Sequence, residues 1–278
     1  MNQRNLLLVV LAVLLGSSAF TPRRSGKPAV PKAVRKQYLE VPAGEAFIGG
    51  DRIPVGAFFL SCSEVTNIAY REYLADLKRI GDTATLAIAI PDTAQWNTEY
   101  AFQEPLRLHY FSHPAYANYP VVNVSQQAAE AYCIWLAGKL NAIASEGTSY
   151  AVRLPSRAEW VLAAQGGLGR TPYSWGGPYT RNSKGCFLAN YRAEGMNGHI
   201  QVHDNAFFTA PVESYFPNGL GLYCMNGNVA EWLQETGLAA GGSWRDGCAD
   251  IRNESVAGVS GPAPTVGFRP LVEVRMAQ

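Results

Sequence analysis

The segment GLYCMNGNVAEW, residues 221–232, is followed by GGSW at 241–244 and by GFR at 267–269. Glycine-rich turns in these segments bracket short aromatic stretches, and one carboxylate, Glu231, stands directly before Trp232. Glycine allows the backbone to turn sharply where other residues cannot. The pattern therefore predicts a core built from loops and short strands rather than from long helices or a regular sheet.

The composition agrees with a single turn-rich domain. The chain has 278 residues, 47% hydrophobic side chains, 11% aromatics and 27 glycines, and it is long enough to bury one sizeable core. No internal repeat is visible. The net charge is +1, and seven cations lie within residues 1–37, so the remainder carries about −6. A mildly acidic body of this kind argues against a nucleic-acid-binding protein.

The N-terminal residues have the pattern of an export signal. Arg4 precedes an apolar run of ten residues at 6–15, and Ser17, Ser18 and Ala19 form a small-residue cleavage site. The alternative is a membrane anchor, but the run is shorter than the 18 or more residues of a spanning helix. We expect a signal peptide at 1–19, a disordered basic leader at 20–37 and one domain at 38–278. The mature protein is then exported to the periplasm or cell envelope, without stable membrane insertion.

Export permits disulfides, and the chain has five cysteines. An odd number leaves at least one unpaired, and their wide spacing matches no zinc site. They stand at Cys62, Cys133, Cys186, Cys224 and Cys248. Cys133 falls on the apolar face of a predicted helix and is interpreted as a small core residue.

Periodicity and capping residues locate the main predicted elements. A strand and turn are expected at 38–50 and a short strand at 58–62. A helix at 63–80 is capped by Thr66 or Asn67, and a helix at 126–144 is capped by Ser125. A strand, turn and helix follow at 150–167, where Ser156 and Glu159 form a capping box.

The region 81–119 shows no sustained period and is expected to be a packed aromatic loop. His109 and His113 stand four apart and would share a metal if they lay on one helix. Pro114 and the surrounding aromatics argue against a helix there. His199 and His203 fall in a Gly/Asn-rich segment, where solvated surface histidines are expected.

A series of short motifs, taken in order, resembles one family, the formylglycine-generating (sulfatase-modifying) enzymes. The motifs are SEVTN at 63–67, YPVV at 119–122, RLPSRAEW at 153–160, WGG at 175–177, GNVAEW at 227–232, GGSW at 241–244 and GFR at 267–269. The resemblance implies a single α+β domain of low regular content, C-type-lectin-like, with much of its core in loops.

A narrower resemblance concerns WGGPYTRNSKGCFLANY at 175–191, together with an insert around Pro91-Asp92 and at 113–116. These stretches are similar to the gliding-motility and type IX secretion lipoproteins of the Bacteroidetes. That likeness implies a non-catalytic scaffold with protein partners in the cell envelope. This chain departs from those lipoproteins because no lipobox cysteine follows its apolar run.

The family's enzymes oxidise a substrate cysteine with O2 on a Cu(I) ion held by two thiolates, because soft ligands select Cu(I). Asp246 and Ile251 stand at the positions that the resemblance assigns to these cysteines. Neither side chain ligates Cu(I), so copper is not expected. If the chain were active, Cys248 and Ser243 would be the candidate catalytic residues.

The resemblance also implies calcium. Asn190, Tyr191, Asp204 and Ala206 have the family's spacing for a first site, made of side-chain and carbonyl oxygens that suit Ca2+. An unmetallated Asn/Asp turn is the alternative. A second, weaker site would use Gly227, Val229 and Glu231, but Cys224 replaces its asparagine ligand.

Two hypotheses follow. The first is a non-catalytic, calcium-stabilised member of the family that serves as a binding or assembly component of the cell envelope, in the manner of gliding motility or type IX secretion. The second is a divergent formylglycine-generating oxidase. Other enzyme classes lack support, because the chain has no G-x-S-x-G, H-E-x-x-H or P-loop motif.

Overall fold

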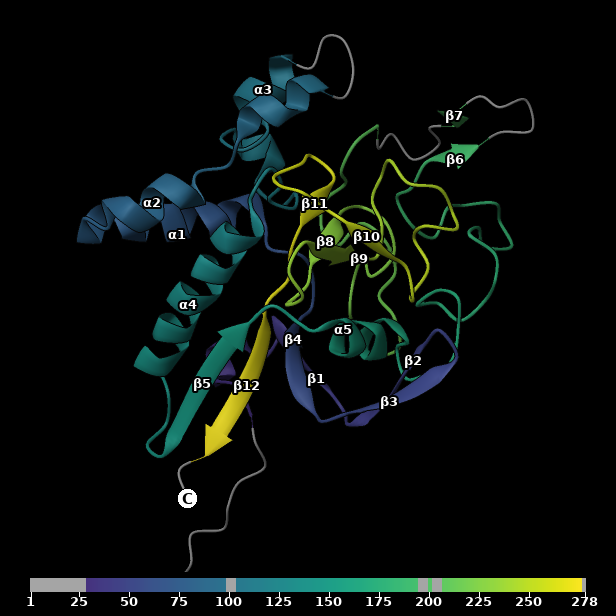
Figure 1. The fold of residues 1–278 in the computed structure, drawn as a ribbon, viewed down its shortest axis with the longest axis horizontal. Helices are drawn as coiled ribbons and strands as arrows, with labels where there is room; N and C mark the ends of the chain where they lie inside the picture. Colours follow the sequence, from purple (N-terminus) through teal and green to yellow (C-terminus); the bar gives the residue numbers. More distant parts are fainter. Residues whose placement is uncertain (1–28, 99–103, 195–199, 202–206, 277–278) are drawn as a thin grey trace, which may run out of the picture.

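The computed structural model describes residues 29–98, 104–194, 200–201 and 207–276. The α-helices are α1 (Asn67–Ile80), α2 (Thr83–Ala89), α3 (Glu104–His109), α4 (Gln126–Ala142) and α5 (Arg157–Ala164). Short 3-10 helices are η1 (Lys32–Val34), η2 (Thr93–Thr98) and η3 (Pro114–Tyr116). Figure 1 shows α1, α2, α3 and α4 on one side of a mixture of short strands and long loops, with α5 lying among those strands, which is the α+β organisation expected from the sequence.

Twelve strands are found in the described residues, and most are short. They are β1 (Tyr38–Val41), β2 (Gly44–Ile48), β3 (Asp51–Val55), β4 (Phe58–Ser61), β5 (Thr148–Arg153), β6 (Ala193–Glu194), β7 (Ile200–Gln201), β8 (Ala230–Trp232), β9 (Leu238–Ala240), β10 (Val256–Gly258), β11 (Val266–Gly267) and β12 (Leu271–Met276).

The larger sheet has the strand order β1-β4-β12-β5. Its last strand in the sequence, β12, lies inside the sheet and pairs antiparallel with both β4 and β5. Leu271 and Val272 at the start of β12 are fully buried, which accounts for the apolar start of this strand. The sheet therefore joins the two ends of the domain.

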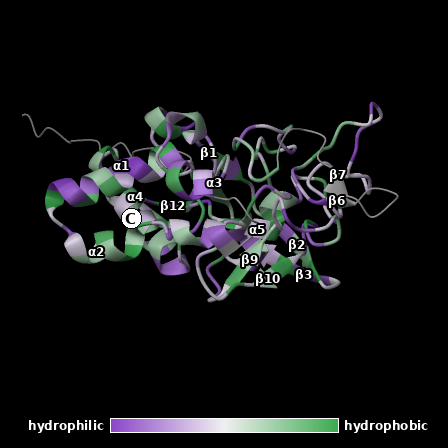
Figure 2. Cartoon of the chain, turned by 90° about the horizontal axis from the view of Figure 1, so that it is seen from above, coloured by the Kyte–Doolittle hydropathy of each residue, from purple (hydrophilic) through white to green (hydrophobic). Residues whose placement is uncertain are grey.

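Helices α1, α2 and α4 pack together beside this sheet, and α4 contacts β5. Thr66 caps α1 by accepting a hydrogen bond from the Ala69 N–H, and Ser125 caps α4 in the same way. Ser156 and Glu159 form the predicted capping box of α5. Seen from above, α1, α2 and α4 occupy one end of the molecule and β6 and β7 the other (Figure 2).

A second, smaller sheet lies at the centre of the loop region, in the order β10-β9-β8-β11. Strand β11 runs parallel to β8, with Gly267 beside Glu231. Because Arg269 follows β11 after one residue, this pairing carries its side chain to Glu231. The GNVAEW and GFR segments thus meet through the backbone of the small sheet.

Three expectations about the fold differ from the structure. Residues 29–37, assigned to a disordered leader, are ordered: Val30 is buried in the core, and the Ala29 carbonyl accepts a hydrogen bond from the Tyr150 hydroxyl. The rest of that leader and the expected signal peptide lie outside the described residues. Helix α1 begins at Asn67 rather than at 63, because Val65 is held in extended form by backbone bonds to Phe268 and Val121.

The region 81–119 is also more helical than expected, since it contains α2, α3 and two 3-10 turns. The aromatic packing predicted there is confirmed, with Trp96 and Tyr110 buried and their ring centroids 4.9 Å apart. Within the described residues, no helix has both the length and the apolar character needed to cross a membrane.

Candidate functional site

The positions expected to carry copper cysteines have structural roles. Asp246 accepts hydrogen bonds from the Ser243 N–H at 2.8 Å and from the Ser243 hydroxyl at 2.6 Å, and so closes the turn after GGSW. Ile251 is fully buried in an apolar cluster with Tyr173 and Ala189. Ser243, the weaker catalytic candidate, is also fully buried and bound to Asp246. These contacts leave no donor set for Cu(I).

Cys248 is exposed and lines an open cavity of about 420 Å³ with Tyr191, Arg192 and Arg181. Its carbonyl accepts a hydrogen bond from the Tyr173 hydroxyl at 2.7 Å. It is the only cysteine among the residues that line this cavity. A second thiolate for a linear Cu(I) site is therefore not provided there.

The other cysteines are dispersed, and all five lie in the described part of the chain without a disulfide. Burial raises the pKa of the Cys62, Cys133 and Cys224 thiols above the usual value, which disfavours the thiolate form. Cys133 is buried on α4, as predicted for a core residue. Cys186 is exposed. The thiol pair that copper chemistry needs is not assembled by these residues.

The structure describes two of the four residues of the first predicted calcium site, Asn190 and Tyr191. Asn190 is buried, and its amide Nδ2 donates to the Phe208 carbonyl at 2.6 Å and to the Asn228 Oδ1 at 3.3 Å. Because the nitrogen is held by these acceptors, Oδ1 is the atom left for a cation. Tyr191 follows directly, while Asp204 and Ala206 lie outside the described residues. The described half fits Ca2+ in its chemistry, since its donors are an amide oxygen and a backbone carbonyl.

Close backbone contact fixes the position of Asn190. Its carbonyl accepts a hydrogen bond from the Asn228 N–H at 2.8 Å. Gly227 has a φ of +76°, and a Cβ there would lie 2.2 Å from the Asn190 carbonyl oxygen. Only glycine permits this approach, so the GNVAEW turn and the Asn190 segment are locked together.

The second predicted calcium site does not fit the ion. Glu231, on β8, accepts hydrogen bonds from Arg269 through Nε at 2.7 Å and Nη2 at 2.6 Å, and from the Trp160 indole at 2.8 Å. A guanidinium thus faces the carboxylate that was expected to bind Ca2+. Cys224, in place of the family's asparagine, offers a buried neutral thiol. Gly227 and Val229 supply carbonyls only.

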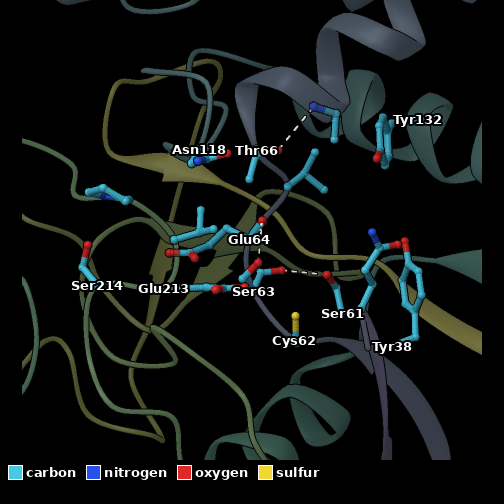
Figure 3. A pocket seen from close by; sticks show the side chains of 15 residues that line it. Tyr38, Ser61, Cys62, Ser63, Glu64, Thr66, Asn118, Tyr132, Glu213 and Ser214 are labelled. Carbon is cyan, nitrogen blue, oxygen red and sulfur yellow. Dashed lines mark hydrogen bonds between the residues drawn. The ribbon is translucent and has the colours of Figure 1, made fainter. Parts of the chain in front are cut away.

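Glu64 is a buried carboxyl that sequence reasoning recognised only as part of a family motif. Its Oε1 accepts a hydrogen bond from the Asn228 amide at 2.9 Å, while Oε2 has no partner. Burial raises the pKa of Glu64 to about 8, an effect that nearby Glu231 reinforces and Arg269 opposes. Figure 3 shows Glu64 among the side chains of a pocket of about 460 Å³, beside Ser63, Cys62 and Glu213.

The histidines do not build a metal site in the described residues. The rings of His109 and His113 lie 6.1 Å apart, and His113 Nδ1 accepts a hydrogen bond from the Ala115 N–H, which caps η3. No group of three or more His, Cys, Asp or Glu side chains in the described ranges is arranged to hold a metal. His199 and His203 lie outside those ranges.

Comparison with known proteins agrees with the fold and with the central motifs. The model of the sulfatase-modifying factor enzyme 1-like domain matches residues 27–274. The formylglycine-generating enzyme of Streptomyces coelicolor is 31% identical over 246 residues, which is 76% of this chain and 72% of that protein. The inactive C-alpha-formylglycine-generating enzyme 2 of Bos taurus is 34% identical over 137 residues, covering 46% of this chain and 39% of that protein.

The chain is also similar to the solved structure of PvdO from Pseudomonas aeruginosa, with a TM-score of 0.58 and 21% identity. The match covers 90% of this chain and 100% of the PvdO chain. At this identity the likeness concerns the fold alone. The family-model match covers most of the chain, and the α+β single-domain expectation is confirmed. The chain belongs to the sulfatase-modifying factor enzyme 1-like domain family.

Proposed function

We propose that this chain is a non-catalytic, calcium-stabilised member of its family that acts as a binding or assembly component of the cell envelope. The observation that carries this proposal is that the two positions assigned to the family's copper-binding cysteines hold residues with structural roles. Asp246 closes a turn and Ile251 fills an apolar cluster. The similar proteins include ones named formylglycine-generating enzyme and ones named inactive C-alpha-formylglycine-generating enzyme 2, so loss of catalysis has precedent among them.

The envelope location and the partners rest on the sequence. The apolar run at 6–15 with its cleavage site supports export. The likeness of 175–191 to gliding-motility and type IX secretion lipoproteins supports protein partners in the envelope. A pull-down from envelope extract identifies them, with the chain from residue 20 onward as the bait so that the buried Val30 is kept. Recovery of the protein only in the cytosolic fraction would contradict the proposal.

The competing function, an oxidase, is favoured by one observation, the exposed Cys248 beside an open cavity. We expect no thiolate–Cu(I) absorption on copper loading and no oxidation of a cysteine-containing sulfatase peptide. An active formylglycine-generating enzyme assayed in parallel serves as the positive control. Turnover by the wild type that disappears in Cys248→Ala would overturn the non-catalytic proposal.

The calcium part of the proposal is tested by stability. A ligand that binds only the folded state at 100 times its Kd contributes about 2.7 kcal/mol. We expect Ca2+ to raise the Tm of the wild type, and Asp204→Ala to melt in Ca2+ at the temperature of the chelator-treated wild type. Asp51→Ala, at the exposed start of β3, is the control and keeps the calcium response. A wild-type Tm that chelator leaves unchanged would show that the site is empty.

A further inference from the structure

Arg269 is an unusual cation because its guanidinium is completely buried and completely satisfied. Its Nε and Nη2 bond the two oxygens of Glu231. Nη2 also donates to the Tyr223 carbonyl at 2.8 Å, and Nη1 donates to the carbonyls of Ser61 and Cys62 at 3.3 and 3.4 Å. These five bonds use all five N–H groups of the side chain.

The groups around Arg269 resemble the shell of a divalent cation in their chemistry. One bidentate carboxylate and three backbone carbonyls converge on it, and hard oxygens of this kind are what Ca2+ takes in proteins. They come from three separate parts of the chain, the end of β4, the loop at Tyr223 and strand β8. The oxygen donors are thus assembled here, but an organic cation fills the space between them.

We propose that Arg269 is the permanent cation of this site, so that Glu231 takes no calcium and any calcium that the protein binds is held by the Asn190 segment. An ion at Glu231 would lie next to a guanidinium in surroundings that exclude water, where repulsion is poorly screened. Moving Arg269 aside would leave its five donors without acceptors in the interior, which is strongly unfavourable.

The substitution at Cys224 agrees with this assignment. Its thiol is buried, and burial keeps its pKa well above the usual value, so the group is neutral and soft. Such a group is a poor ligand for Ca2+. The inference goes beyond the proposed function, because the guanidinium excludes calcium from Glu231 whether or not the protein is an enzyme.

The test is the number and the location of bound calcium ions. Wild-type protein freed of metal with chelator is titrated with Ca2+ by calorimetry, and bound calcium is measured independently by equilibrium dialysis. The variants are Asp204→Ala, Glu231→Gln and Cys224→Asn, which restores the family's ligand. Circular dichroism in chelator confirms that each variant is folded before it is titrated.

We expect the wild type to bind one ion, Asp204→Ala to bind none, and Glu231→Gln and Cys224→Asn to match the wild type. A wild type that binds no calcium supports the assignment of Arg269 and instead contradicts the calcium part of the proposed function. Two ions on the wild type, an ion retained by Asp204→Ala, an ion lost in Glu231→Gln or one gained in Cys224→Asn would each overturn the inference. The wild-type and Cys224→Asn results decide the question even if Glu231→Gln does not fold.

Discussion

Replacing Arg269 with methionine is expected to lower the free energy of unfolding by about 3–5 kcal/mol, the usual cost of removing one partner from a buried ion pair. The substitution leaves the Glu231 carboxylate, which is 1% exposed, without its counter-ion. It also removes the donors that hold the carbonyls of Ser61, Cys62 and Tyr223. Methionine fills much of the same volume, so the loss reports on charge and hydrogen bonding more than on a cavity.

Denaturant unfolding followed by circular dichroism measures this change. Arg275→Met is the matched control, because Arg275 pairs with Glu273 at 3.2 Å on the exposed end of β12, and exposed pairs contribute about 0–1 kcal/mol. The double variant Arg269→Met/Glu231→Gln is expected to recover part of the loss, since no charge is then stranded. If Arg269→Met unfolds within 1 kcal/mol of the wild type, the pair is not a determinant of stability.

The features that the sequence predicted well depend on local chemistry. Thr66, Ser125 and the Ser156–Glu159 box each cap a helix through atoms three residues away, so the residue types and their spacing are sufficient. The Gly-Gly turn between β2 and β3 belongs to the same class, with φ values of +60° and +100° at Gly49 and Gly50. Short-range rules suffice for such features.

The centre of the molecule depends on contacts between residues distant in the sequence, which spacing does not reveal. Glu231 meets Arg269 from 38 residues away, and Glu64 meets Asn228 from 164 residues away. The family's spacing predicts calcium at Glu231, yet the side chain that pairs with it, Arg269, comes from the segment between β11 and β12. Similarly, Val30 stands alone among prolines and cations, and nothing near it indicates the surface beside Tyr150 on which it packs.

Glu64 gives the second large effect, a dependence of stability on pH. Burial raises its pKa in the folded protein to about 8, from an ordinary value of 4.5. Between these values the folded state keeps a proton that the unfolded state has lost. Stability from this group is therefore complete below about pH 4.5, decreases as the pH rises towards 8 and changes no further above it. One proton corresponds to roughly 1.4 kcal/mol per pH unit, so a loss of about 2–3 kcal/mol is expected from pH 5.5 to 7.5.

Glu64→Gln is expected to abolish this decrease, because glutamine keeps the acceptor for Asn228 and does not ionise. Carboxyls with a lowered pKa, such as that of Glu159, act in the opposite sense but at more acidic pH. Thiols with a raised pKa, such as that of Cys62, act in the same sense as Glu64 but at more basic pH, so unfolding is measured from pH 5.5 to 7.5. Glu130→Gln, an exposed position on α4, is the control and should follow the wild-type profile. At pH 5.5 the free energy of unfolding of Glu64→Gln is expected to be lower than that of the wild type, since the new amide nitrogen replaces an oxygen that already lacks a partner. This difference in the free energy of unfolding should become smaller as the pH rises. If it stays constant with pH, Glu64 is already ionised in the folded protein.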